Sequence, residues 1–409
     1  MNGASRQILR TYVTLVLLST FAASFIWGIN TLFLLDAGLS ITAAFAANAF
    51  FTIGQVVFEV PTGVVADSMG RRVSFLAGAA TLFISTLLYF LLWRVSGPLW
   101  AWALASMLLG LGFTFFTGAT EAWLVDALTF VGYEGALDDA FAKGEIAAGL
   151  AMLTGAVAGG VIAQFTNLGV PYLLRAALLA ITFLIAWSLM HDVGFTPRRS
   201  ASVARDMGNI VASALNHGLR NPPVRWVMLA GPFLAGVGYY VFYAMQPFLL
   251  QLYGIEEAYA IAGLAAAVIA CAQIVGGLIV PYVRRAFRRR TQLLLAAAAI
   301  TSGALALIGL FPSFWLALVL LALWAVVDSA SFPVRQAFIN GLIPSEQRAT
   351  VLSSDNLLSS AGGVVQPLLG RTADAWGFAA SYVVGAGITL VALPFTLLAH
   401  REHAPSDPL

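Results

Sequence analysis

Three carboxylates lie within long apolar stretches of this 409-residue chain, where the neighbouring side chains offer few polar partners. They are Asp328, Glu121 and Glu59. Asp328 has no basic residue at its own depth, because Arg335 follows about two helical turns later. An acid without a nearby cation can take up and release a proton, so we predict these three residues as proton-coupling groups.

Two of these acids have alternative interpretations that the sequence leaves open. Glu121 is also compatible with a permanent ion pair to Arg335. Glu59 stands two residues before Pro61, so it is also compatible with a hydrogen bond to backbone that the proline leaves free. Asp126 falls on another helical face than Glu121, and we interpret it as a structural carboxylate close to a loop.

Polar and aromatic residues recur at helical spacing near these acids. The second apolar stretch carries a polar stripe of Asn48, Thr52, Gln55, Glu59 and Gly63, and the fourth carries Gly110, Thr114, Thr117 and Glu121. The predicted lining of a substrate cavity is Trp27, Asn30, Gln55, Tyr239, Tyr240, Tyr243, Gln246 and Trp324. The alternative for the tyrosines is ordinary packing or interfacial placement.

The composition indicates a membrane protein. Hydrophobic residues make up 60% of the chain, charged residues 10%, and the mean hydropathy is +0.88. Soluble domains carry about 25% charged residues, so a soluble enzyme, a nucleic-acid binder and a disordered protein are all excluded. With one cysteine, Cys271, and four histidines outside the apolar stretches, the sequence predicts no metal site and no cofactor.

The apolar stretches are long enough to span a bilayer, which takes roughly 20 residues. They cover residues 12–35, 42–66, 73–93, 99–125, 145–166, 171–190, 226–252, 258–283, 292–311, 314–337, 351–373 and 377–399. Short linkers force neighbouring helices to run antiparallel. The sequence therefore predicts an all-α membrane protein with twelve transmembrane helices.

The longest polar stretch divides these spans six and six. We predict an N-terminal six-helix bundle at 1–190, a cytoplasmic linker at 191–225 and a C-terminal six-helix bundle at 226–409. Glu121 aligns with Arg335 and Glu59 with Gln273 at the same offset of 214 residues, which indicates two pseudo-symmetric halves. Transporters that work by alternating access use such a plan, with the substrate held between the halves.

The positive-inside rule places both termini in the cytoplasm, since most of the 21 basic residues then fall on the inner side. Only Arg94, Arg175 and Arg371 remain outside. We expect a multi-pass protein of the plasma (inner) membrane that is a monomer surrounded by lipid.

The loop after the second span reads Gly63-Val-Val-Ala-Asp67-Ser-Met-Gly70-Arg71-Arg72. It resembles the signature loop of the major facilitator superfamily, with Ser68 in place of the usual base. The resemblance implies the superfamily fold, and it implies that Asp67 and Arg71 brace the outward-facing state. We expect Gly63 to permit close helix contact and Gly70 to form a tight turn. The predicted conformational motif comprises Gly63, Asp67, Gly70, Arg71, Arg72 and Arg335.

The fifth span carries Gly155, Gly159 and Gly160, which we predict to be helix-packing glycines. The string is similar to the antiporter motif of drug/proton exporters, with Ala156 in place of its proline. The alternative is generic close packing of helices. The fourth span has Phe113 and Thr114 where those exporters carry a membrane arginine.

These observations favour a secondary active transporter that exchanges protons for small amphiphilic or aromatic molecules, resembling bacterial drug or metabolite efflux proteins. The alternative is a proton-coupled uptake symporter for a small polar nutrient. A membrane receptor or assembly subunit without transport is a third possibility. The expected partners are the small-molecule substrate, protons and the lipid bilayer, and neither enzymatic activity nor nucleic-acid binding is predicted.

Overall fold

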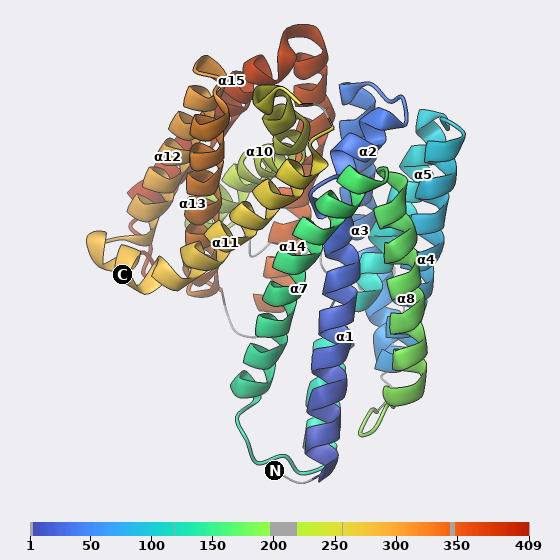
Figure 1. The fold of residues 1–409 in the computed structure, drawn as a ribbon. Helices are drawn as coiled ribbons and strands as arrows, with labels where there is room; N and C mark the ends of the chain where they lie inside the picture. The colour runs from blue at the N-terminus through green and yellow to red at the C-terminus, as the bar shows by residue number, and fades with distance from the viewer. Residues whose placement is uncertain (1–2, 118, 197–218, 256, 344–347, 409) are drawn as a thin grey trace. The chain divides into compact units, whose positions relative to one another are not determined.

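The computed structural model describes residues 3–117, 119–196, 219–255, 257–343 and 348–408, and nearly all of them are helical (Figure 1). The first half contains α1 (Gly3–Trp27), α2 (Asn30–Asp36), α3 (Ile41–Met69), α4 (Arg71–Arg94), α5 (Leu99–Phe116), α6 (Ala119–Phe130), α7 (Leu137–Phe165) and α8 (Gly169–Leu189). The second contains α10 (Pro222–Tyr253), α11 (Tyr259–Val283), η2 (Arg284–Ala286), α12 (Arg290–Leu310), α13 (Phe314–Asn340), α14 (Arg348–Ser360), η4 (Ala361–Val364) and α15 (Val365–Arg401). Most of the predicted linker 191–225, with Arg198, Arg199 and Arg205, lies outside the described residues.

Eleven helical segments of the described residues are long and apolar enough to cross a bilayer. The last one, Ser354–Arg401, has 48 residues and is broken at Gly377, where φ is 85°. Glycine adopts this left-handed conformation without the steric cost that a Cβ would bring, so the chain turns there. The last two predicted spans are thus the two legs of this segment, and the twelve-helix, all-α fold is confirmed.

Two predicted spans are interrupted. In the first, α1 ends at Trp27 and α2 begins at Asn30. In the fourth, α5 ends at Phe116 and Thr117 is extended, with ψ of 125°. The predicted polar stripe from Gly110 to Glu121 therefore does not run along one helix. The helix end is compensated by side chains: the hydroxyls of Thr117 and, from α3, Thr62 donate to the carbonyl of Thr114, at 3.0 and 3.2 Å.

The chain forms two compact units. The first comprises Met1–Gly38, Phe50–Val203 and Glu257–Ala267, and the second comprises Leu39–Ala49, Ala204–Glu256 and Val268–Leu409. The start of α3 thus belongs to the second unit, and the start of α11 belongs to the first. The remainder of each unit follows the two halves of the chain.

Each unit has a core of large apolar side chains. In the first unit, Leu15 of α1, Phe75 of α4 and Leu124 of α6 are almost completely buried. In the second, Val227 of α10 packs with Phe338 of α13 in a cluster at one end of these helices. This cluster fixes α10 against α13.

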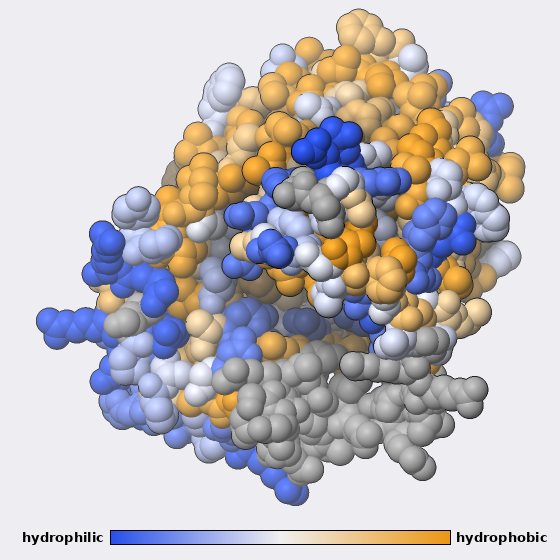
Figure 2. All heavy atoms as spheres, turned by 90° about the horizontal axis from the view of Figure 1, so that it is seen from below, coloured by the Kyte–Doolittle hydropathy of each residue, from blue (hydrophilic) through white to orange (hydrophobic). Residues whose placement is uncertain are grey.

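Large hydrophobic side chains also lie on the outside, as expected for a protein whose solvent is lipid. Phe165, Trp376 and Trp100 are 83%, 74% and 67% exposed. Figure 2 shows broad hydrophobic areas on the visible face, with the hydrophilic residues gathered in patches. In water such a surface would associate, and in a bilayer it contacts acyl chains.

A distant carboxylate caps the first turn of α3 within the second unit. Asp374 of α15 accepts hydrogen bonds from the backbone N–H groups of Ile41, at 3.0 Å, and Thr42, at 2.8 Å. It also accepts one from the Thr42 hydroxyl at 2.6 Å, while Ser40 accepts from the N–H of Ala43 at 3.2 Å. The first N–H groups of a helix have no partner within it, and a negative charge there is favourable.

We predict that Asp374→Ala lowers the thermal stability of the purified protein, because the N–H groups of Ile41 and Thr42 lose their acceptor. Loss of a helix cap costs about 1 kcal/mol. Asp374→Asn retains a carbonyl acceptor and should lose less. Unfolding followed by intrinsic fluorescence in detergent measures both variants. Equal stability of the wild type and the alanine variant would show that the cap is energetically neutral.

Candidate functional site

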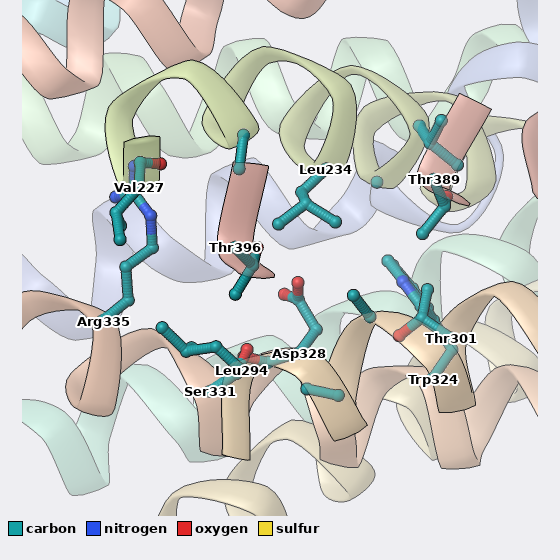
Figure 3. Close-up of a pocket in the computed structure, with 15 residues that line it drawn as sticks. Val227, Leu234, Leu294, Thr301, Trp324, Asp328, Ser331, Arg335, Thr389 and Thr396 are labelled. Carbon is teal, nitrogen blue, oxygen red and sulfur yellow. The ribbon is translucent and has the colours of Figure 1, made fainter. Parts of the chain in front are cut away.

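A pocket lies within the second unit, lined by α10, α12, α13 and α15 (Figure 3). Its polar lining consists of Thr301, Trp324, Asp328, Ser331, Arg335, Thr389 and Thr396. Its apolar lining includes Val227, Leu234, Val237 and Leu294. A few polar groups in an apolar cavity are typical of small-molecule sites, which makes this pocket the candidate functional site.

Asp328 is the central charged residue of the pocket. Figure 3 shows its carboxylate directed from α13 into the open space, with Thr396 and Leu234 on the opposite wall. The side chain is exposed to this space. Among the described residues, no donor or cation contacts the carboxylate. On another face of α13, the Ser329 hydroxyl donates to the Gln273 carbonyl of α11 at 2.7 Å. This hydrogen bond fixes the part of α13 that carries Asp328 against α11.

Three hydroxyl groups of the lining have already used their hydrogen. Thr389 donates to the Gly385 carbonyl and Thr396 to the Ala392 carbonyl, both at 3.0 Å. Ser331 donates to the Asp328 carbonyl at 2.9 Å. A hydroxyl that donates to its own helix keeps only lone pairs for a further partner. These three oxygens therefore face the pocket as acceptors.

Arg335, at one end of the pocket, is neutralised by Asp355 of α14. Both terminal nitrogens of the guanidinium donate to the two carboxylate oxygens, Nη1 to Oδ2 and Nη2 to Oδ1 at 2.6 Å. Nη2 also donates to the Val227 carbonyl at 3.3 Å. The Asp355 side chain is fully buried and that of Arg335 is 15% exposed. Bidentate geometry of this kind gives a strong ion pair.

Asp355 was not among the predicted residues, although an acid within the apolar stretch 351–373 was a visible signal. The sequence also allowed an ion pair between Glu121 and Arg335. In the structure the ion pair of Arg335 is made with Asp355.

The other two predicted proton-coupling acids lie in the first unit. Glu121 is in the first turn of α6 and Glu59 is in α3, and both are exposed. Among the described residues neither carboxylate has a hydrogen-bond or ion-pair partner. The backbone carbonyls near Pro61 instead accept hydrogen bonds from the Thr62 hydroxyl, which donates to Phe58 at 2.8 Å and to Glu59 at 3.1 Å. The alternative hydrogen bond from Glu59 to this backbone is not formed.

The predicted cavity residues fall in different surroundings. Trp324 lines the pocket, one helical turn before Asp328. Tyr240 is completely buried, bonds to Ser381 at 2.5 Å and packs on Phe45. The other members are distributed as follows: Trp27, Gln55, Tyr239 and Tyr243 are half-buried, Gln246 is buried, and buried Asn30 accepts from the Tyr172 hydroxyl at 3.0 Å.

The loop between α3 and α4 carries an ion-pair network. Arg71 donates to Asp67 at 2.6 Å, and its Nε lies 3.8 Å from Asp126. Arg72 donates to the Trp187 carbonyl at 2.5 Å and lies over the Trp187 ring. Asp126 is thus a structural partner of Arg71, in keeping with its interpretation as a loop-proximal carboxylate.

Asp192, which was not among the predicted residues, caps α4. It accepts the backbone N–H of Arg72 at 2.9 Å, and a Cβ added to Gly70 would collide with its carboxylate. Burial raises the pKa of Asp192 above its ordinary value, while the Arg72 N–H and the charges of Arg72 and Arg71 oppose this rise. The position just after the sixth span was the only signal in the sequence.

The two motif glycines behave differently. Gly70 has φ of 111°, which permits the turn into α4 as expected. Gly63 is exposed, and an added Cβ would have no atom within 4 Å. The expected close helix contact at Gly63 stays a prediction, because the described neighbours of α3 within its own unit do not approach this residue.

The glycines of α7 lie at close helix contacts inside the first unit. A Cβ on Gly155 would lie 2.7 Å from the Ser24 Cβ of α1, and Gly159 faces the Phe25 backbone. A Cβ on Gly160 would lie 2.9 Å from the Gly263 Cα of α11. These contacts let α7 pack closely on two neighbours.

Arg175 of α8 is a further charge without a predicted role, since the sequence analysis only counted it on the outer side of the membrane. It is 1% exposed, and its Nε and Nη2 atoms have no hydrogen-bond partner among the described residues. Its guanidinium lies 5.9 Å from the centre of the Phe113 ring, a cation–π distance.

The sequence matches the family model described as the Major Facilitator Superfamily over residues 13–367 and again over 281–409. No curated protein matches it.

Several solved structures share the fold. The nucleoside transporter NupG is 15% identical, with a TM-score of 0.78 and coverage of 97% of this chain and 99% of that one. A bacterial homolog to the human lysosomal transporter Spinster, inward-facing and occupied, is 16% identical, with a TM-score of 0.75 and coverage of 100% and 99%. A POT family transporter in complex with 5-aminolevulinic acid is 13% identical, with a TM-score of 0.72 and coverage of 95% and 94%.

We predict that Asp355→Asn strongly destabilises the protein, because it leaves the Arg335 charge without its counter-ion. Breaking a buried pair in this way costs about 3–5 kcal/mol. The double variant Arg335→Gln/Asp355→Asn removes both charges and should recover much of the loss. A double-mutant cycle on apparent melting temperature measures the coupling. Additive effects of the two substitutions would refute it.

A pH dependence follows from Asp192. Its pKa is raised in the folded protein, so the folded state holds the proton more tightly than the unfolded state, and the stability contribution of Asp192 falls as pH rises from 3.8 through the raised pKa. Asp192→Asn retains an acceptor for Arg72 but does not titrate. The melting temperature of this variant relative to wild type should therefore rise across that window. A difference that stays constant with pH would contradict the assignment.

Proposed function

The chain belongs to the major facilitator superfamily, and we propose that this membrane transporter exchanges protons for a small amphiphilic molecule at the pocket around Asp328. Membership makes it a multi-pass transporter and not an enzyme. The proton coupling, the substrate class and the direction of transport are the content of the proposal.

The observation that carries the proposal is a carboxylate that faces a pocket without a partner. A charge in an apolar environment is costly unless it is paired or neutralised by a proton. Arg335, the other charged residue of the lining, already pairs with Asp355. Asp328 is therefore free to cycle between its charged and protonated forms as access to the pocket changes.

The remaining acids have proposed supporting roles. Glu59 and Glu121 are proposed as further proton-binding groups, since neither carboxylate has a hydrogen-bond or ion-pair partner among the described residues. Trp324 is the predicted cavity residue that lines this pocket and is proposed as a substrate contact. The network of Asp67, Arg71 and Asp126 is proposed to stabilise one conformational state.

For the direction of transport we propose export. The support is the close packing of α7 through Gly155, Gly159 and Gly160, the string that is similar to the antiporter motif, together with the apolar lining of the pocket. The hydroxyl groups of the lining favour the alternative, uptake of a polar nutrient. Cells that express the transporter should accumulate less of a transported probe than cells without it. Greater accumulation would decide for uptake.

We also propose a monomer in the plasma (inner) membrane with both termini in the cytoplasm. The support is the distribution of arginines, with Arg71 and Arg72 after α3 and an arginine-rich segment between α11 and α12. Reporter fusions to the C-terminus test the orientation, and active alkaline phosphatase there would reject it. Light scattering of the purified protein tests the monomer, and a dimer mass would reject that part.

We predict that Asp328→Asn abolishes the effect of a pH gradient on transport. A thermal-shift panel at two pH values first selects a bound probe, and its flux is then measured in proteoliposomes. The matched control is Asp139→Asn, at an exposed acid in the first turn of α7, which should retain the effect. The loss in Asp328→Asn should exceed that in Asp126→Asn. Wild-type flux that is indifferent to collapse of the gradient would refute the coupling.

A further inference from the structure

We propose that a basic cavity at the start of α1 binds the phosphate headgroup of an anionic phospholipid. The site lies in the first unit and is separate from the pocket around Asp328. Its ligand is a lipid of the leaflet at which α1 begins, which is the inner leaflet in the proposed orientation. The inference depends neither on the transported substrate nor on proton coupling.

The cavity lies between the first turns of α1 and the end of α8, two helices that pack together within the first unit (Figure 1). It has a volume of about 380 Å³, and Leu189 of α8 completes its lining. Arg6, Arg10 and Thr14 follow one another at intervals of four residues, so they share one face of α1. The polar lining residues are Arg6, Gln7, Arg10, Thr11 and Thr14.

Two positive charges face this cavity without a counter-ion. Neither Arg6 nor Arg10 has a hydrogen-bond or ion-pair partner among the described residues, and the described lining includes no carboxylate. The carboxylates of Glu121 and Glu145, on neighbouring helices, act electrostatically on Tyr12. Tyr12 follows Arg10 by two residues, so it lies on another face of α1. The cavity therefore carries two uncompensated positive charges, which attract an anion.

The neutral polar groups of the cavity can donate further hydrogen bonds. The side chains of Gln7, Thr11 and Thr14 form no hydrogen bond with other described residues. Phosphate oxygens are acceptors, and the planar guanidinium of arginine matches their geometry. Arg6 and Arg10 thus offer charge-assisted hydrogen bonds to a phosphate, and the hydroxyl and amide groups offer additional donors to the same group.

The surroundings of the cavity favour a lipid over a soluble phosphate. At the end of α8, the side chains of Leu184, Trp187 and Leu189 are all exposed. On α1, Leu17 is also exposed and lies on the same face as Arg10, about 10 Å further along the helix. Exposed tryptophan and leucine side chains at the end of a membrane helix contact headgroups and acyl chains. A basic cavity beside such a surface matches the two parts of a phospholipid.

The test uses purified full-length protein in detergent. Phosphatidylglycerol and phosphatidylcholine with identical acyl chains are titrated, and binding is measured by native mass spectrometry and by the melting temperature. Inorganic phosphate and glycerol phosphate supply the anionic group without acyl chains. Arg6→Gln/Arg10→Gln removes both charges, and Arg6→Lys/Arg10→Lys retains them. The matched control is Arg284→Gln/Arg285→Gln, which removes two exposed arginines of the second unit and changes the net charge equally.

A thiol reporter shows whether the lipid occupies this cavity. Cys271 is the single cysteine of the chain, so Cys271→Ser/Leu189→Cys carries one thiol, at the edge of the cavity. Bound phosphatidylglycerol should slow the labelling of this thiol by a water-soluble maleimide, and phosphatidylcholine should not. Arg6→Gln/Arg10→Gln introduced into the same protein should abolish the protection.

Phosphatidylglycerol is expected to bind more tightly than phosphatidylcholine and to raise the melting temperature. Each arginine close to the membrane surface strengthens the binding of an anionic lipid about fivefold, so Arg6→Gln/Arg10→Gln should weaken it about thirtyfold. The lysine variant and the Arg284→Gln/Arg285→Gln control should keep most of the preference. High salt should weaken binding, because the charges lie near the surface.

Equal affinity for the two lipids would overturn the inference, and so would a preference for phosphatidylglycerol that survives Arg6→Gln/Arg10→Gln. Inorganic phosphate or glycerol phosphate that binds as tightly as the lipid would reject the lipid as the ligand. Thiol labelling that phosphatidylglycerol does not slow would reject the cavity as its site. None of these outcomes affects the proposed transport at Asp328, which Asp328→Asn tests separately.

Discussion

The cost of an unpaired charge in apolar surroundings determines how the second unit is built. Arg335 and Asp355 neutralise each other, and the two hydrogen bonds of their bidentate pair replace the hydrogen bonds to water that burial removes. Asp328 lies two turns from Arg335 on the same helix and has no such partner among the described residues. The same physical rule therefore makes one acid a structural group and leaves the other available to a proton or a ligand.

Backbone hydrogen bonding is the second constraint, and it shapes the chemistry of the pocket indirectly. Hydroxyl groups in apolar helices donate to carbonyls of their own helix, as Thr389 and Thr396 do. Helix ends lack such internal partners, and carboxylates from distant segments supply them: Asp374 at α3 and Asp192 at α4. The acceptor character of Thr389 and Thr396 in the pocket is thus a consequence of backbone hydrogen bonding within their own helix.

Much of the fold was predictable because its signals are local. Apolar stretches of membrane length predicted the helices, and the Gly70 turn followed from its place in the loop motif. Contacts between residues far apart in the chain, and the surroundings that neighbouring helices create, have no such local signal. An added Cβ on Gly63 would meet no atom within 4 Å, and the Tyr240 hydroxyl is hydrogen-bonded to Ser381. Periodicity gives the face of a helix on which a residue lies, but it does not give what covers that face.

By itself, the sequence determined that the chain spans a membrane many times, that Asp328 lies within a span, and to which superfamily the loop motif belongs. These follow from hydropathy, helical rise and local residue order. Only the tertiary structure decided that Arg335 is neutralised by Asp355, 20 positions away, and that Asp328 is the free charge of the pocket. Electrostatic pairing acts over a few ångströms in space, so it becomes readable only when the fold has brought the helices together.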